Sequence, residues 1–258
     1  MKLDRDTWLS DVMGWEVQRI NLSTEDTNSN INSLNSEFQA LALGIPRSKN
    51  ILLFAKLASD QLDLVNWLID LGFYVVEEAI TLTRQQGHKV SMANNHLATV
   101  RDMGVKDSDS VISIAKNSFR YSRFHVDPLI PLSIANQIKG QWMRSYIEGT
   151  RGNSVLIGLL EDKPAGFLAI LDDVIGRESC LTIDLIAVDP EHQRHGVAQT
   201  MIQSLVLRAE HENKVIKVGT QAANTASLEL YKSCGFEIFK TEYVLHHHFG
   251  NNASQIEQ

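Results

Sequence analysis

The apolar positions of the chain fall into two series of predicted elements. In the first series, the run 51–55 predicts a buried strand. Apolar residues at helical spacing over 62–71 predict a helix that Gly72 ends, and 73–83 predicts a second strand. The stretch 21–36 is rich in Asn, Ser and Thr, so it predicts a loop.

The second series begins after a polar, mixed stretch that ends near residue 127. A helix is predicted from about Ser133 to Gly149, because apolar residues recur there every four positions. The remaining elements are two further helices at 197–211 and 225–233 and strands at 154–161, 165–171, 181–188, 215–220 and 236–246. Regular alternation in the third of these strands sorts its residues onto two faces: Leu181, Ile183, Leu185 and Ala187 on one, and Asp184, Ile186 and Val188 on the other.

The mixture of strands and helices predicts an α/β (mixed α+β) fold. We expect a smaller helper domain over 1–112 and a larger domain over 113–258. The segment 71–77, which contains Leu-Gly-Phe, resembles 234–239, which contains Cys-Gly-Phe, and each opens a strand after a helix. A decayed duplication explains this likeness, although helix–Gly–Phe–strand junctions are also common. No glycine-containing phosphate loop precedes the first of the two helices, so we expect the first part to be scaffold.

Composition narrows the class of protein. Of the 258 residues, 43% are hydrophobic and 21% are charged, which excludes a wholly disordered chain. The formal net charge of −7 argues against a nucleic-acid-binding protein. No apolar run approaches the ~20 residues that span a bilayer, and the N-terminus lacks the apolar segment of a signal peptide. Cys180 and Cys234 form no disulfide framework, so a cytoplasmic protein is expected.

The strongest chemical signal is the segment 185–198, in which a strand runs through a short loop into an amphipathic helix. The N–H groups at a helix start lack internal acceptors, and the helix dipole favours an anion there. Gly196 tolerates positive φ and close approach to a ligand, so the loop can wrap a pyrophosphate. Arg194 can add charge-assisted hydrogen bonds. The competing interpretation is that Gly196 only helps the chain to enter the helix.

The spacing Gln193-x-x-Gly196-x-Ala198 resembles the signature with which the GNAT superfamily of N-acetyltransferases binds the pyrophosphate of acetyl-CoA. Residues 224–236, Asn-Thr-Ala-Ser-Leu-Glu-Leu-Tyr-Lys-Ser-Cys-Gly-Phe, resemble a second block of that superfamily. The resemblance spans about 154–245 and implies the GNAT fold, a central mixed, splayed sheet flanked by helices, with acetyl-CoA as co-substrate and no metal. The cofactor-binding residues that it implies are Ile186, Ala187, Val188, Gln193, Arg194, His195, Gly196, Val197, Ala198 and Asn224. Asn224 is equally consistent with a plain helix cap.

A narrower likeness concerns the acceptor. Ser122-Arg123-Phe124, the pair Gln141-Trp142, Gly149 and the run 220–226 resemble dTDP-fucosamine acetyltransferases, which acetylate a 4-amino-4,6-dideoxygalactose on a nucleotide diphosphate. Leu230 departs from this pattern, because a basic residue is expected there. The likeness suggests that Arg120, Tyr121 and Arg123 bind the substrate diphosphate and base, although a solvated basic loop explains them equally well. Because the net charge is acidic, such binding depends on a local basic patch.

Acyl transfer needs an oxyanion stabiliser, a proton donor for the departing thiolate and a route for the amine proton. Backbone N–H groups at the end of strand 181–188 suit the first role. The resemblance assigns the second to Tyr231, whose alternative is a core aromatic residue. Asp184 and Glu178 are candidate bases. Asp184 is alternatively a solvent-facing strand residue, and water is an alternative route for the amine proton.

Two further hypotheses of function stay open: a GNAT enzyme with another amine acceptor, such as a protein N-terminus or a polyamine, and a non-catalytic CoA-binding module. A homodimer is a hypothesis for the assembly. The run His246-His247-His248 ends the last strand or is the remainder of a tag. Adjacent strand residues point to opposite faces, so these three cannot bind one metal from one side.

Overall fold

The computed structural model describes residues 1–22, 31–43, 50–87, 97–152, 154–175 and 178–250. The chain forms two compact units, and neither is a single continuous segment. Unit 1 comprises Met1–Ala79, Val126–Pro131 and Thr241–Gln258, and unit 2 comprises Ile80–His125 and Leu132–Lys240. Two long strands, β4 (Tyr74–Arg84) and β10 (Glu237–Phe249), contribute residues to both units. The division into a helper domain over 1–112 and a larger domain over 113–258 stays a prediction.

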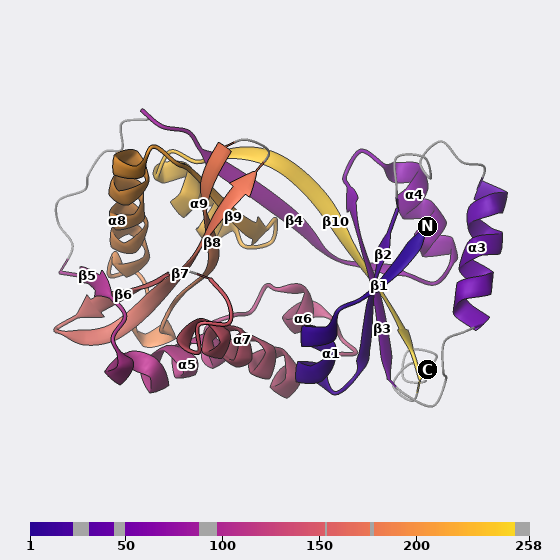
Figure 1. The fold of residues 1–258 in the computed structure, drawn as a ribbon, viewed down its shortest axis with the longest axis horizontal. Helices are drawn as coiled ribbons and strands as arrows, with labels where there is room; N and C mark the ends of the chain where they lie inside the picture. The colour runs from indigo at the N-terminus through magenta and orange to yellow at the C-terminus, as the bar shows by residue number, and fades with distance from the viewer. Residues whose placement is uncertain (23–30, 44–49, 88–96, 153, 176–177, 251–258) are drawn as a thin grey trace. The chain divides into compact units, whose positions relative to one another are not determined.

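Unit 1 has a mixed sheet in which β1 and β2 are antiparallel, β2 and β3 are parallel, and β3 and β10 are antiparallel. Its other elements are β1 (Lys2–Arg5), α1 (Thr7–Met13), β2 (Glu16–Asn21), α3 (Ile31–Leu43), β3 (Ile51–Ala58) and α4 (Leu62–Asp70) (Figure 1). Strand β3 and helix α4 lie where the apolar pattern predicts them. The prediction of a loop over 21–36 is wrong in its last part, because α3 begins at Ile31 and buries Leu34 and Phe38.

A buried carboxylate joins three parts of unit 1. The Asp127 Oδ2 atom contacts His246 Nδ1 at 2.5 Å and His248 Nε2 at 2.9 Å. Its Oδ1 atom accepts hydrogen bonds from the Tyr74 hydroxyl at 2.8 Å and from the Leu129 N–H at 2.9 Å. These contacts use the acceptor positions of both carboxylate oxygens. The polar cluster is therefore satisfied inside the core, and His246 and His248 share one face of β10, as the alternation predicts.

The same contacts give the stability of unit 1 a dependence on acid. Burial alone raises the pKa of Asp127, but the hydrogen bonds from His246 and His248 outweigh it and hold this pKa well below its ordinary value. The depressed pKa adds stability that is fully present above the unfolded pKa of about 3.9 and is lost as the pH falls through the folded pKa. We expect Asp127→Asn to lower the free energy of unfolding at neutral pH by about 1–3 kcal/mol, because it disturbs a satisfied buried group. Urea unfolding from pH 7 to pH 3 measures this, and a difference between the two proteins that stays constant below pH 4 would contradict it.

Unit 2 has a sheet with the strand order β4-β9-β8-β7-β6-β5. Its strands are β5 (Thr99–Asp102), β6 (Ser154–Leu160), β7 (Lys163–Ile175), β8 (Glu178–Val188) and β9 (Val215–Gln221). Its helices, two of them 3-10, are η1 (Val105–Asp107), α5 (Ser108–Asn117), α6 (Arg123–Val126, of which Val126 belongs to unit 1), α7 (Leu132–Ile147), η2 (Pro190–His192), α8 (Val197–Glu212) and α9 (Thr225–Ser233). Among the described helices of the chain, none is long and apolar enough to cross a membrane.

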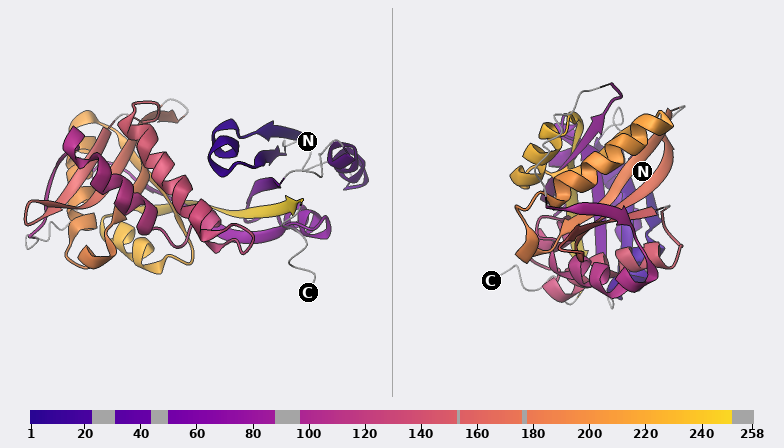
Figure 2. Two further views of the ribbon diagram at one scale, coloured as in Figure 1. Left: turned by 90° about the horizontal axis from the view of Figure 1, so that it is seen from below. Right: turned by 90° about the vertical axis from the view of Figure 1, so that its left-hand side faces the viewer.

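Helices cover both faces of the sheet in unit 2. The core on one face combines strand residues with α8 and α9, and the core on the other face combines them with α5 and α7. Figure 1 shows α8 on one side of strands β6 to β8 and α5 and α7 on the other, and Figure 2 shows the same arrangement from two further directions. The helices and strands predicted over 133–246 are confirmed, and each observed end lies within four residues of the predicted end.

Strand β8 contains a bulge that reverses its alternation. Ala169 pairs with Leu185 and the next residue, Ile170, pairs with Ile183, so Asp184 is an extra residue in β8. Before the bulge, Ile183 packs with α8 and α9; after it, Leu185 packs with α5 and α7. The predicted assignment of residues 181–188 to the two faces of the sheet is therefore wrong. The side chains of β8 that face α8 and α9 are those of Leu181, Ile183, Ile186 and Val188. Those that face α5 and α7 are Leu185 and Ala187.

The two helix ends that resemble each other in sequence also share their hydrogen bonds. Helices α4 and α9 both have nine residues. The Phe73 N–H donates to the Leu68 carbonyl, and the Phe236 N–H donates to the Tyr231 carbonyl, both at 3.0 Å. The intervening Gly72 has φ +91°, and its counterpart after α9 has φ +82°, the left-handed conformation that ends such helices. The duplication stays a prediction, and Leu68 stands where the second helix has Tyr231.

Candidate functional site

The carboxyl ends of two parallel strands of unit 2 diverge. Strand β8 pairs with β9 only over Cys180–Ile183, yet it continues to pair with β7 as far as Val188. After the bulge at Asp184, none of the described strands therefore pairs with the side of β8 that faces β9. Ligands in open α/β sheets bind beyond the carboxyl ends of the strands, where connections diverge. Two of the predicted backbone donors, the N–H groups of Ile186 and Val188, point to this unpaired side. The N–H of Ala187 points to β7, as does that of Asp189, which donates to the Ala165 carbonyl at 2.8 Å.

The connection from β8 to α8 adopts the conformation that an anion-binding loop requires. Asp189 caps the short helix η2 by accepting a hydrogen bond from the Glu191 N–H at 2.9 Å. Two residues then take positive φ, Arg194 at 66° and Gly196 at 78°. Left-handed residues within a turn can direct successive N–H groups to one side and form a concave anion site. Gln193, Arg194 and His195 are exposed along this loop.

The first turn of α8 is not capped by the side chain of its N-cap residue, which is Gly196. Val197 is buried, and a Cβ at Gly158 on β6 would come within 2.5 Å of its Cγ1 atom, so the helix start rests directly on the sheet. Ala198 is partly exposed and small. The helix start is thus fixed by packing while its dipole end stays available to an anion.

Helix α9 follows β9 and begins at the same edge of the sheet. Asn224 is its N-cap, and the side-chain oxygen of Asn224 accepts a hydrogen bond from the Ser227 N–H at 3.3 Å. The interpretation of Asn224 as a helix cap is therefore confirmed. A contact between Asn224 and a ligand stays a prediction.

Tyr231 lies on α9 with its ring inside the core of unit 2. It is 2% exposed, and its ring centroid is 5.6 Å from that of Phe236. Burial raises the pKa of the Tyr231 hydroxyl well above its ordinary value, and the neighbouring Cys234 thiol adds to this rise. The phenol is therefore fully protonated at neutral pH, as a proton donor must be. Both interpretations of this residue, core aromatic and acid, fit the observed position.

The segment that carries these features matches a known family. Residues 122–236 match the family model "Acetyltransferase (GNAT) family". Residues 122–236, somewhat less than half of the chain, are thus similar to a GNAT acetyltransferase domain, and this segment is called the GNAT domain below. The match includes the β8–α8 connection and helix α9, and it ends at Phe236, the first residue after the glycine that closes α9.

Comparisons with individual proteins extend the likeness of fold beyond residues 122–236. The chain is 24% identical over 141 residues to the spore coat polysaccharide biosynthesis protein SpsD of Bacillus subtilis, covering 54% of this chain and 47% of that protein. It thus spans about half the length of this curated relative. Two solved structures have a similar fold, each at 10% identity over 90% of this chain. They are a GCN5-related N-acetyltransferase from Sphaerobacter thermophilus, with a TM-score of 0.59 and 72% of that chain covered, and a tandem GNAT protein from the clavulanic acid biosynthesis pathway, with a TM-score of 0.56 and 75% covered.

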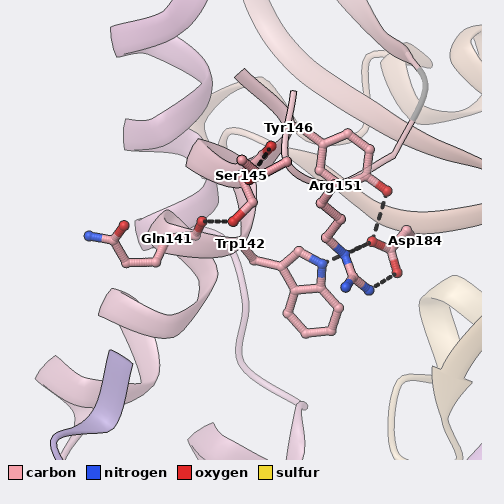
Figure 3. Close-up of polar contacts among 7 residues, drawn as sticks. Gln141, Trp142, Ser145, Tyr146, Arg151 and Asp184 are labelled. Carbon is pink, nitrogen blue, oxygen red and sulfur yellow. Dashed lines mark hydrogen bonds and ion pairs between the residues drawn. The ribbon is translucent and has the colours of Figure 1, made fainter. Parts of the chain in front are cut away.

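Asp184 in the GNAT domain is occupied by hydrogen bonds. Its Oδ2 atom accepts from Trp142 Nε1 at 2.9 Å, from the Tyr146 hydroxyl at 2.8 Å and from Arg151 Nε at 2.7 Å, and its Oδ1 atom accepts from Arg151 Nη2 at 3.0 Å (Figure 3). A carboxylate with four donors is poorly placed to take a proton from an amine. The interpretation of Asp184 as a base is therefore unfavourable. The side chain of Glu178 lies outside the described residues.

The three predicted substrate-binding residues lie between α5 and α7. Arg120 and Tyr121 are exposed, and Arg123 begins the short helix α6 with its guanidinium 4.5 Å from the centroid of the Phe124 ring. Arg120 and Tyr121 are thus accessible to solvent, and Arg123 is half-buried. Their role in binding stays a prediction.

Sequence reasoning missed the group around Asp184. Trp142 and Tyr146 are four residues apart on α7, which signals a shared face. Arg151 returns to the same place because Gly149 and Gly152 take positive φ after the helix. No local pattern joins these residues to a carboxylate more than thirty positions further along the chain.

Proposed function

We propose that the chain is an acetyl-CoA-dependent N-acetyltransferase that acetylates the amino group of a nucleotide-linked amino sugar, of the dTDP-4-amino-4,6-dideoxyhexose type, by direct transfer. The observation that carries the proposal is the opening between β8 and β9 beside the left-handed loop at Gly196. An extended thioester needs backbone donors along its length, and its pyrophosphate needs a helix start; the GNAT domain offers both at one sheet edge.

The residues of the chain divide the chemistry as follows. The loop at Gln193–Ala198 holds the pyrophosphate through its N–H groups, and Arg194 adds a positive charge. Bound acetyl-CoA supplies the activated acetyl group. Backbone N–H groups of Ile186 and Val188 stabilise the negative charge that develops on the carbonyl oxygen as the amine attacks. Tyr231 donates its phenolic proton to the departing thiolate, and the amine loses its proton to water.

Two observations favour an amino sugar on a nucleotide as the acceptor. The relative SpsD is a protein of spore coat polysaccharide biosynthesis, a class of pathway that uses activated sugars. Arg120, Tyr121 and Arg123 also concentrate positive charge and an aromatic ring in the short segment between α5 and α7 of an acidic protein. Guanidinium groups bind phosphate oxygens in pairs, and a phenol ring can stack on a base.

A screen of acceptors tests the proposal directly. The purified chain is incubated with acetyl-CoA and, separately, with amino-sugar nucleotides, peptides with free N-termini and polyamines, while release of the CoA thiol is followed. We expect release with a dTDP-linked amino sugar. Release with a peptide or polyamine alone would assign another amine, and binding of acetyl-CoA without release in any arm would indicate a non-catalytic CoA-binding module.

We expect Arg120→Ala to raise the KM for the nucleotide sugar by about tenfold, because a hydrogen bond to a charged group contributes about 1.5–3 kcal/mol and exposure reduces this. The affinity for acetyl-CoA should not change. Steady-state kinetics with each substrate varied in turn measures both. Lys163→Ala, which removes the same charge from an exposed position at the start of β7, is the control. Equal KM values for the two variants would contradict a role of Arg120 in acceptor binding.

A further inference from the structure

The end of β8 has no hydrophobic pattern that fixes which side each residue faces. Leu185, Ile186, Ala187 and Val188 are all apolar, and both faces of the sheet are covered by apolar cores. A shift of one residue in register moves every side chain of a strand to the other face. Here such a shift exchanges one apolar set for another, so hydrophobic burial alone discriminates weakly between the bulged strand and a regular one.

Asp184 removes this ambiguity because its carboxylate is polar and its hydrogen-bond donors lie on one face of the sheet. It is the extra residue of the bulge, and its carboxylate lies on the α7 side, where four hydrogen bonds hold it. In a regular strand, the residue after Ile183 points to the opposite face from Ile183, and the next returns. The bulge instead leaves Asp184 and Leu185 on the same side. A regular strand would place Leu185 toward α8 and α9. It would also shift the pairing of β8 with β7 by one residue.

The partners of Asp184 are themselves held in place. Two cations contact the Trp142 ring, with Lys139 Nζ at 4.8 Å and Arg151 Cζ at 4.7 Å from its centroid. A Cβ at Gly152 would come within 1.9 Å of the Tyr146 ring, so the glycine lets the chain pass directly over this ring. Burial and the Asp184 charge raise the pKa of the Tyr146 hydroxyl, which keeps it a donor. Figure 3 shows the Trp142, Tyr146 and Arg151 side chains converging on Asp184.

We propose that Asp184 is a positioning residue that fixes the bulged register of β8 and thereby holds open the acetyl-CoA side of the strand. Pairing with β9 stops at Ile183, the residue immediately before it, so the anchored bulge and the divergence of the strands coincide. The peptide N–H groups of Ile186 and Val188, which point away from β7, then face the opening. This inference rests on the proposed function, because it assigns those groups to the bound thioester. Asp184 acts through the strand and does not touch the substrate.

The chain offers a matched control for this role. Asp107 makes a similar two-pronged ion pair, with Arg101 Nη1 at 2.6 Å from its Oδ2 atom and Arg101 Nη2 at 2.8 Å from its Oδ1 atom. The side chains are 35% and 3% exposed for Arg101 and Asp107, against 39% and 10% for Arg151 and Asp184. Asp107 also belongs to unit 2, but it anchors the turn at Gly104 and does not contact β8 in any described hydrogen bond. Loss of either ion pair should lower stability similarly.

The experiment measures acetyl-CoA affinity by calorimetry and thermal stability for the wild type, Asp184→Asn and Asp107→Asn, each as the full chain. We expect Asp184→Asn to raise the Kd for acetyl-CoA about tenfold or more, and Asp107→Asn to leave it within about twofold at a comparable loss of Tm. Tyr146→Phe keeps the ring and removes one of four hydrogen bonds, so a smaller rise in Kd is expected. It also serves as the test if Asp184→Asn does not fold.

Each outcome has a defined meaning. A larger rise in Kd for Asp184→Asn than for Asp107→Asn, with an intermediate value for Tyr146→Phe, supports the positioning role. Equal Kd values in all variants, or equal rises for Asp184→Asn and Asp107→Asn, would overturn it while leaving the proposed function intact. A wild type with no measurable affinity for acetyl-CoA would overturn both.

Discussion

Tyr231→Phe is expected to lower the kcat of acetyl transfer by about 10²- to 10⁴-fold, the usual contribution of general acid catalysis. A value near the lower end is expected, because a CoA thiolate leaves readily in water. The substitution keeps the ring that packs against Phe236 and removes only the hydroxyl, so the Tm should change little. Acetyl-CoA affinity should also stay unchanged, because the lost interaction forms only in the transition state. Pre-steady-state kinetics separates the chemical step from product release.

Tyr243→Phe is the control for this experiment, since it removes a phenol from unit 1 at a partly buried position of β10. Its kcat should equal that of the wild type. If Tyr231→Phe also shows wild-type kcat while chemistry limits the rate, Tyr231 is a core aromatic residue and another group protonates the thiolate.

Gly196→Val is expected to raise the Kd for acetyl-CoA by at least about 100-fold. A β-branched residue at φ +78° is strained and places methyl groups where the loop must approach the pyrophosphate. Loss of two hydrogen bonds to a charged group, at about 1.5–3 kcal/mol each, accounts for this change. Calorimetry on the folded variant measures it.

Gly14→Val separates ligand contact from backbone strain. Gly14 also has positive φ, +68°, next to a helix, and a Cβ there meets nothing within 4 Å. This variant should lose stability but retain acetyl-CoA affinity. Equal affinity in Gly196→Val and the wild type would move the pyrophosphate to another part of the chain.

Local signals predicted the elements of the GNAT domain well. Periodicity and turn residues placed α8, α9 and the flanking strands, because Gly196 and Asn224 begin helices through chemistry that involves only their near neighbours. Alternation also predicted that His246 and His248 share a face of β10. It did not predict Asp127 as their partner, because that contact depends on how distant segments meet.

The bulge in β8 is the clearest failure of sequence reasoning. Alternation assigns Leu185 to the face of Ile183, whereas the structure places them on opposite faces. The cause is the set of hydrogen bonds to Asp184, whose donors come from α7 and the turn after it. A second failure is α3, where Asn and Ser suggested a loop although burial of Leu34 and Phe38 favours a helix. In both cases tertiary contacts decide against the local pattern.

The pairing of β3 with β10 has a consequence for the order in which the chain folds. Strand β3 is buried along most of its length, and the partner that covers one of its edges is the last described strand. During synthesis at about 5–20 residues per second, β3 leaves the ribosome on the order of ten seconds or more before β10 does. Unit 1 therefore cannot complete its sheet until β10 has been synthesised, although the first strands of unit 1 are synthesised before unit 2. In that interval an apolar strand edge is available to other chains, so the speed at which unit 2 is translated determines how long a nascent chain is exposed to aggregation or to chaperones.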